Sequence, residues 1–108
     1  MAEDADAAEL PLIAECRLDL DGLRSQRERY RRLGERLEGL DRGLHAFTVR
    51  FDEAVDPGLV EETVAVEREC CPFFELAFDA RERRLTLSVQ DDQQAPALDG
   101  LLFALGAA

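Results

Sequence analysis

Two adjacent cysteines, Cys70 and Cys71, are the residues of this chain whose types and spacing are best suited to chemistry. They stand at the end of a segment with helical periodicity and directly before Pro72, which disfavours helical geometry at the residue before it. Glu67 precedes them by three and four positions, and residues at these offsets are neighbours on one helix face. The group can therefore converge on one small volume that offers two sulfur atoms and one carboxylate.

Cys16 is the third cysteine, and it would add a third sulfur if the segment that carries it crosses the end of this helix. Thiolates are soft ligands that favour Zn(II), Cu(I) and, by extension, Hg(II), Cd(II) or As(III). The paired C-x-x-C spacings of structural zinc sites are missing, which argues against a closed zinc knuckle. We therefore expect a soft metal or metalloid ion bound by three thiols, with Glu67 as a fourth ligand or as a nearby hydrogen-bond acceptor. The protein would act as a scavenger, carrier or sensor accessory.

Two other hypotheses stay open. A thiol-dependent redox or detoxification enzyme would use one cysteine to attack and its neighbour to resolve the intermediate. A structural or interaction module would bury its cysteines as small apolar side chains, and its apolar segment Leu98 to Leu105 would pack in a homodimer. The negative end of the helix dipole, together with Glu67, raises the thiol pKa and disfavours a free nucleophile. Exposed thiols would speak for binding or redox chemistry, and buried thiols for the structural module.

Glu67 falls within the apolar arc of the helix that carries it, whereas Glu69 projects away from that arc. A carboxylate is costly to bury without a partner. We therefore expect Glu67 to be buried with a cationic, metal or hydrogen-bond partner and Glu69 to be exposed. His45 is the only histidine; it could be a further ligand, but a surface or edge position is more common for such a residue.

Composition limits the classes of protein. The chain has 108 residues, the length of one domain, and its 46% hydrophobic content is typical of a globular protein. A formal net charge of -11 opposes binding to phosphate backbones, so we expect no nucleic acid partner. The sequence has neither an apolar run long enough to span a bilayer nor the features of a signal peptide. We expect no membrane association and a cytoplasmic location, where cysteines stay reduced.

The elements that position the thiols follow from periodicity and capping. We expect a disordered acidic tail over 1–9 and a single domain over 10–108, with a strand at 10–18, a helix from about 21 to 40, a strand at 44–51, a helix from 57 to 71, a hairpin of 74–78 with 85–89, and a helix at 96–105. Asp56 and Pro57 are a typical helix start, and Gly34 marks a point where the first helix breaks or bends. The order favours an α+β two-layer sandwich, in which helices pack on one face of a small, largely antiparallel sheet.

Apolar side chains at helical spacing define the first helix: Leu23, Tyr30, Leu33, Leu37 and Leu40. Its other faces carry arginines between residues 24 and 36, with glutamates at four-residue offsets from several of them. Such offsets are typical of ion pairs on a solvated helix surface. We expect this basic cluster to be an exposed helix face rather than an anion site.

Residues 67–73, Glu-Arg-Glu-Cys-Cys-Pro-Phe, resemble the E-x-E-C-C-P-F signature of a small bacterial family of about this length. Members of that family carry a cysteine before the first helix, a position matched here by Cys16, with Leu18 and Leu23 following it. Its domains occur alone or attached to regulators of the MerR type, which respond to metals and other stimuli. The resemblance implies metal or metalloid handling. It implies no DNA reading, because this chain has no helix-turn-helix module of its own.

Overall fold

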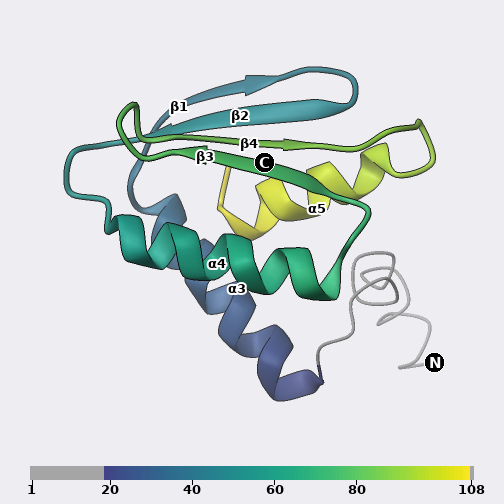
Figure 1. Cartoon of the computed structure of the whole chain (residues 1–108), viewed down its shortest axis with the longest axis horizontal. Coiled ribbons are helices and arrows are strands. Elements are labelled where there is room, and N and C mark those ends of the chain that lie inside the picture. The colour runs from purple at the N-terminus through teal and green to yellow at the C-terminus, as the bar shows by residue number, and fades with distance from the viewer. Residues whose placement is uncertain (1–18, 108) are drawn as a thin grey trace.

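The structure is a computed structural model that describes residues 19–107. The elements of this part, in chain order, are α3 (Leu20–Gly34), β1 (Leu37–Arg42), β2 (Ala46–Phe51), α4 (Pro57–Cys70), β3 (Glu75–Asp79), β4 (Arg84–Ser88) and α5 (Ala95–Ala104). The strands form one sheet in the order β1-β2-β4-β3, and every neighbouring pair is antiparallel. These helices all lie on the same side of the sheet (Figure 1), which confirms the expected α+β fold.

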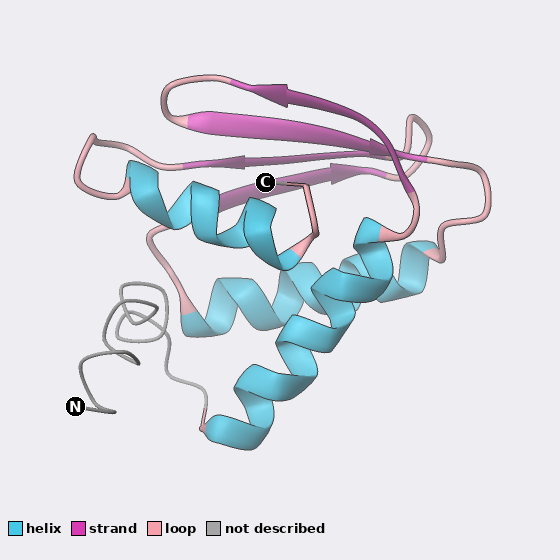
Figure 2. Ribbon diagram, turned by 180° about the vertical axis from the view of Figure 1, so that it is seen from behind, coloured by secondary structure: helices cyan, strands magenta, loops and turns pink. Residues whose placement is uncertain are grey.

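Helices α4 and α5 lie next to the sheet, and α3 crosses beneath them and contacts both (Figure 2). One face of α3 therefore packs against α4, the helix that ends at the cysteine pair. The tail and the strand expected over residues 1–18, and Cys16 with them, lie outside the described residues.

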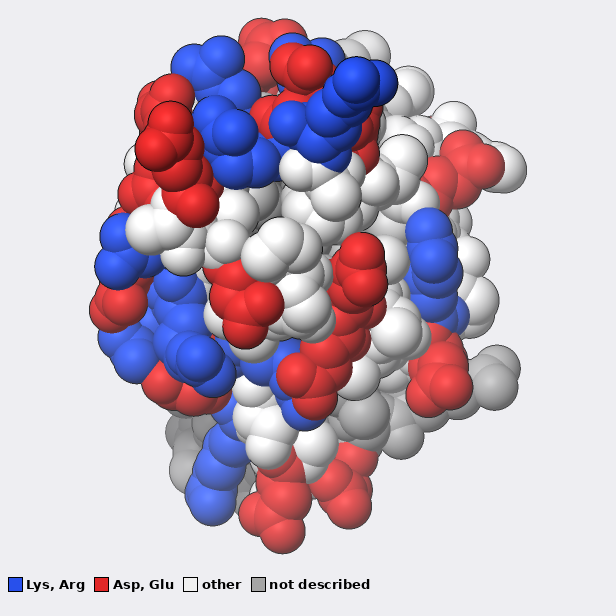
Figure 3. Space-filling model, turned by 60° about the vertical axis from the view of Figure 1, so that its left-hand side comes forward, with Lys and Arg blue, Asp and Glu red and all other residues white. Residues whose placement is uncertain are grey.

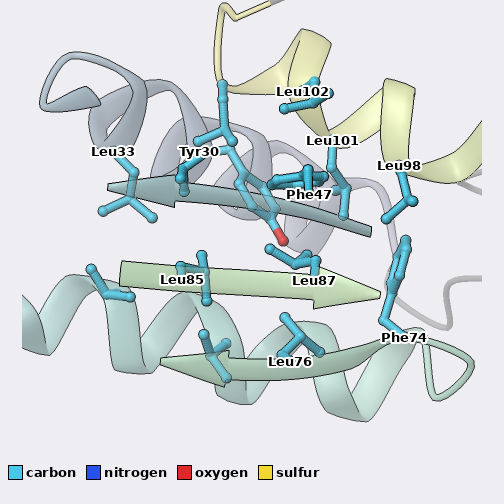
Figure 4. Packing of buried hydrophobic residues seen from close by; sticks show 14 of the residues in the cluster. Tyr30, Leu33, Phe47, Phe74, Leu76, Leu85, Leu87, Leu98, Leu101 and Leu102 are labelled. Carbon is cyan, nitrogen blue, oxygen red and sulfur yellow. The ribbon is translucent and has the colours of Figure 1, made fainter. Parts of the chain in front are cut away.

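The core face of the sheet is built from alternate residues of its central strands. Three side chains of β2 are at most 1% exposed, as their alternation predicted: Phe47, Val49 and Phe51. Across the antiparallel register, Phe47 is paired with Leu87 of β4. Leu98 and Leu101 of α5 close the same cluster from the helix side (Figure 4). The sheet therefore forms one layer of the fold, and the helices pack against its core face.

The expected first helix is wrong only over its last six residues, 35–40, because the helix ends at Gly34, where the sequence indicated a break or bend, and the chain then enters a strand. A Cβ atom at Gly34 would lie 1.8 Å from the carbonyl oxygen of Leu105, so the end of α5 passes directly against this backbone. The strand β1 has a register shift between Leu37 and Gly39. This bulge puts Leu37 and Leu40 on the same face although they are three residues apart. That spacing is the one that a helix would also show.

Helix α4 begins and ends close to where the sequence predicted. Asp56 caps the first turn, its carboxylate accepting a hydrogen bond of 2.9 Å from the backbone N–H of Gly58, and Pro57 is the first helical residue. The last helical residue is Cys70, and Cys71 leaves the helix with φ -131° and ψ 74° ahead of the proline. Both thiols therefore lie at the C-terminal end of α4, where the chain turns toward β3.

Charged side chains of both signs share the surface. On the face shown in Figure 3, acidic and basic side chains are interspersed. Arg31 of α3 pairs with Glu28 and Glu35, and the side chains of these pairs are all more than half exposed. The basic cluster of the first helix is thus a solvated face, as expected. None of the helices within residues 19–107 has the length and apolar character needed to cross a bilayer.

Candidate metal centre

Three side chains of metal-ligand type meet at the end of α4. One carboxylate oxygen of Glu67 and the sulfur atoms of Cys70 and Cys71 all lie within 4.8 Å of one another. The two Sγ atoms are 3.5 Å apart, and the Cys70 Sγ is 3.8 Å from Glu67 Oε2. The three residues are 2%, 2% and 0% exposed, and neither cysteine forms a disulfide with another described residue. The predicted convergence of the acid with this cysteine pair is confirmed, and the group could hold a metal ion.

The carboxylate of Glu67 is held by side chains from α3. The hydroxyl group of Tyr30 donates a hydrogen bond of 2.6 Å to Glu67 Oε1. The side-chain amide of Gln26 donates to the same oxygen at 3.3 Å and to the backbone carbonyl of Thr63 at 2.9 Å. Arg29 donates to the Gln26 Oε1 at 2.9 Å, which orients that amide. Helix packing between α3 and α4 therefore fixes one oxygen of the acid and leaves Oε2 facing the thiols.

The two glutamates of the motif have opposite environments. Glu67 is buried and hydrogen-bonded, whereas Glu69 is exposed, as the helix wheel predicted. The partners of Glu67 are a phenol, an amide and a thiol, all of them neutral donors. The basic side chain nearest along this network, Arg29, bonds to Gln26 rather than to the acid. Because these donors carry no charge, an ionised carboxylate here would favour an electropositive centre beside the sulfur atoms.

Burial also controls the protonation of the site. It is the main cause that raises the pKa of the Cys71 thiol, and the negative charge of Glu67 and the neighbouring Cys70 thiol raise that pKa further. The pKa of Tyr30 is raised well above its ordinary value by burial and then by the charge of Glu67. At neutral pH both groups therefore keep their protons. A metal cation that binds here has to displace thiol protons, because the thiolate is the ligand form.

His45 belongs to a different and more open part of the molecule. Its Nε2 atom lies 2.6 Å from Asp92 Oδ1, and the two side chains are 37% and 85% exposed. Within residues 19–107, the group of converging ligands contains the acid and the cysteine pair but not this histidine. His45 is thus partly exposed and lies just before a strand, which agrees with the expected surface or edge position. The place of Cys16 relative to the pair lies outside the described residues.

Two residues of the site, Gln26 and Tyr30, were not identified as such from the sequence. The apolar stripe of the first helix includes Tyr30, and its side chain is buried, as the stripe predicts. Gln26 stands three residues after Leu23 and four before Tyr30, in register with the same stripe. A lone polar side chain inside an apolar stripe is the signal that could have found it, because a buried amide needs partners.

Comparisons of the chain with protein-family models, with curated proteins and with solved structures found no significant match. The fold and the site therefore define its class by themselves. It is an α+β protein with a buried acid–dithiol group that could hold a metal ion.

Proposed function

We propose that this protein binds a soft metal or metalloid ion through Cys70, Cys71 and Glu67, as a scavenger, carrier or sensor accessory of the cytoplasm. The observation that carries the proposal is the convergence of two sulfur atoms and a carboxylate oxygen within 4.8 Å in a buried site. Sulfur donors select thiophilic ions over hard cations such as magnesium or calcium. The resemblance to a family associated with metal-responsive regulators agrees with this proposal.

The electrostatics of the site favour binding over thiol catalysis. A free nucleophile needs a thiolate, yet burial and Glu67 raise the pKa of Cys71. The C-terminal end of α4 adds the negative end of a helix dipole to that effect. A bound cation reverses the balance, because it compensates the carboxylate and the thiolates together. The redox hypothesis consequently ranks below ion binding.

The structural module is the second candidate, and burial of both thiols is the observation that favours it. Cysteine is among the residue types most often found in protein cores. Glu67 argues against a purely structural role, because apolar packing does not require a carboxylate beside two thiols. Replacing such a buried polar group together with its hydrogen-bond partners by well-packed apolar residues is often neutral or stabilising. Its presence here is more easily explained by a ligand.

Calorimetric titration with cadmium chloride tests the proposal, using buffers of different ionisation enthalpy. We expect one ion per chain and a net release of protons. Cys70→Ser and Cys71→Ser should each weaken binding by more than the roughly 10- to 100-fold that loss of an outer partner of a metal ligand costs. His45→Ala is the matched control and should bind like the wild type. Equal affinity of both cysteine variants and the wild type would refute the assignment.

Native mass spectrometry after incubation with Zn(II), Cd(II), Hg(II) and arsenite extends the test to other ions. A stoichiometric adduct with any of them supports a binding protein. A metal-free mass under every condition, with a protein that is folded by circular dichroism, would leave the structural module as the better account. Participation of the third thiol stays a prediction. The same measurement on Cys16→Ser tests it.

A further inference from the structure

The spacing of the two sulfur atoms restricts the geometry of the ion that they could share. Cys70 and Cys71 are both buried, so the surrounding packing restricts their side chains, and their Sγ atoms are 3.5 Å apart. With metal–sulfur bonds of about 2.3 Å, that separation corresponds to an S–M–S angle of roughly 100°. A linear dithiolate, the preferred arrangement of Hg(II), would need sulfur atoms about 4.6 Å apart at the same bond length. The pair is thus arranged for an ion whose bond angle is near 100° rather than 180°.

The number of ligands points in the same direction. The converging group in the described residues supplies two sulfur atoms and one carboxylate, whereas a structural zinc site takes four protein ligands. Trivalent arsenic and antimony form three bonds, and their lone pair compresses the angles between these bonds below the tetrahedral value. Two sulfur atoms at 3.5 Å therefore supply two corners of a pyramid, and one corner is left for oxygen.

Burial favours a neutral species over a hydrated cation. Both thiols are at most 2% exposed, so an ion that reaches them must lose its water first. Removing a divalent cation from water is expensive, whereas a neutral hydroxide of a trivalent metalloid has a much smaller desolvation cost. In the exchange, two metalloid–oxygen bonds break and two metalloid–sulfur bonds form. Each leaving hydroxide takes one thiol proton and departs as water, so the reaction needs no oxidant and creates no new charge.

The hydrogen bonds of Glu67 leave a position for the hydroxyl group that such a species would retain. Oε1 already accepts from Tyr30 and Gln26, and Oε2 lies 3.8 Å from the Cys70 sulfur. When Cys70 loses its proton, Oε2 loses that donor. The hydroxyl group on the bound metalloid would replace it, so Glu67 would act as a hydrogen-bond acceptor rather than as a direct ligand.

We infer that the natural ligand of this site is a trivalent metalloid hydroxide of the arsenous acid type, bound by Cys70 and Cys71 with one hydroxyl group kept and hydrogen-bonded to Glu67. The inference rests on the proposed function and adds the class of ion. It separates this site from one adapted to linear thiophilic cations.

Competition with dithiothreitol, a flexible dithiol without a fixed sulfur spacing, tests the selectivity. Full-length protein and dithiothreitol compete for sodium arsenite and, separately, for mercuric chloride, and the fraction of protein loaded is read by mass spectrometry. Relative to dithiothreitol, we expect the protein to prefer arsenite over Hg(II) by at least about tenfold, equal to about 1.4 kcal/mol. Arsenic X-ray absorption on the loaded protein should give two sulfur ligands and one oxygen ligand.

The outcomes separate this inference from the proposed function. An equal or greater relative preference for Hg(II) would overturn the metalloid assignment and leave ion binding intact. A shell of three sulfur atoms without oxygen would overturn the retained hydroxyl group. No adduct with either ion in a folded protein would overturn both proposals. Glu69→Gln, a change on the exposed acid of the same motif, is the matched control and should leave both competitions unchanged.

Discussion

Helix α3 carries polar groups on two faces, and the surroundings of the two faces differ. On the outer face Arg31 pairs with two glutamates, and all three side chains are more than half exposed to water. On the inner face Gln26 and Tyr30 donate to one carboxylate, that of Glu67, which is 2% exposed. Water can replace the partners on the first face, whereas only the protein can satisfy the groups on the second. Polar groups with similar chemistry therefore fix a geometry only on the inner face, and a ligand set can be preorganised only there.

The largest effect expected from this comparison is on Glu67. Glu67→Ala leaves the Tyr30 hydroxyl and the Gln26 amide buried without their shared acceptor and opens a small cavity. We expect a loss of about 3 kcal/mol in the free energy of unfolding, even after relief from burying a charge. Glu67→Gln keeps one acceptor oxygen and should lose less. Urea denaturation followed by circular dichroism gives both values.

Glu69→Ala and Glu69→Gln are the matched controls, because this acid belongs to the same motif and is exposed. Both should stay close to the wild type in urea midpoint. Equal, negligible effects at Glu67 and Glu69 would show that the hydrogen bonds of the inner face contribute nothing to stability. The contrast between the two faces would then have no energetic basis.

A bound ion should add stability only through the buried group. Any ligand that binds the folded chain alone stabilises it by about 2.7 kcal/mol at a free concentration 100 times its dissociation constant. We expect a gain of this size with cadmium chloride for the wild type and for His45→Ala. Cys70→Ser should lose the gain. A gain that survives in Cys70→Ser but disappears in His45→Ala would move the site to the exposed histidine and aspartate.

The sequence was sufficient for the elements whose signals agree with each other. Asp56 and Pro57 mark the start of α4, and the proline after Cys71 marks its end, because capping and proline sterics are local. The alternation that predicted β2 is likewise local. Strand β1 was missed because its bulge spaces Leu37 and Leu40 as a helix would. Only the partner strand reveals a bulge, so residue spacing alone could not reveal it.

The site was predictable in the same partial way. The helix wheel found the acid and both thiols because Glu67 and Cys70 belong to the last turn of one helix and Cys71 directly follows it. Gln26 and Tyr30 come from a helix more than thirty residues away, and the sequence does not state which face of α3 meets α4. A buried carboxylate did predict that donors would exist. Their identity depends on helix packing, which local patterns do not determine.

Raising the pH should lower the free energy of unfolding gradually, through two buried groups on the inner face. The pKa values of Cys71 and Tyr30 are raised above their ordinary values of 9.0 and 10.0, so in the folded chain both groups stay protonated where the unfolded chain has already lost these protons. The unfolded state then binds fewer protons, and stability falls as pH rises above about 9. Each group contributes a slope of up to about 1.4 kcal/mol per pH unit. Urea denaturation of the reduced, metal-free protein from pH 8 upward measures it.

Tyr30→Phe separates the two contributions to this slope. Its stability should fall less steeply than that of the wild type above pH 10, because one titrating group is gone. The chain has one tyrosine and no tryptophan, so ultraviolet absorbance reports the ionisation of Tyr30 directly. Tyrosinate that forms near pH 10 while the protein is still folded would contradict the raised pKa.

The smallest effect should come from the outer face of α3, where Arg31→Ala removes both of its surface ion pairs. We expect no change in the urea midpoint beyond experimental error, because salt and water already screen such pairs. Arg29→Ala provides the comparison on the border between the faces. Its side chain is only 21% exposed and orients the Gln26 amide, so it should cost about 1 kcal/mol. A larger loss for Arg31→Ala than for Arg29→Ala would reverse the ranking of the faces, and raising the salt concentration would then show whether exposed charge is the cause.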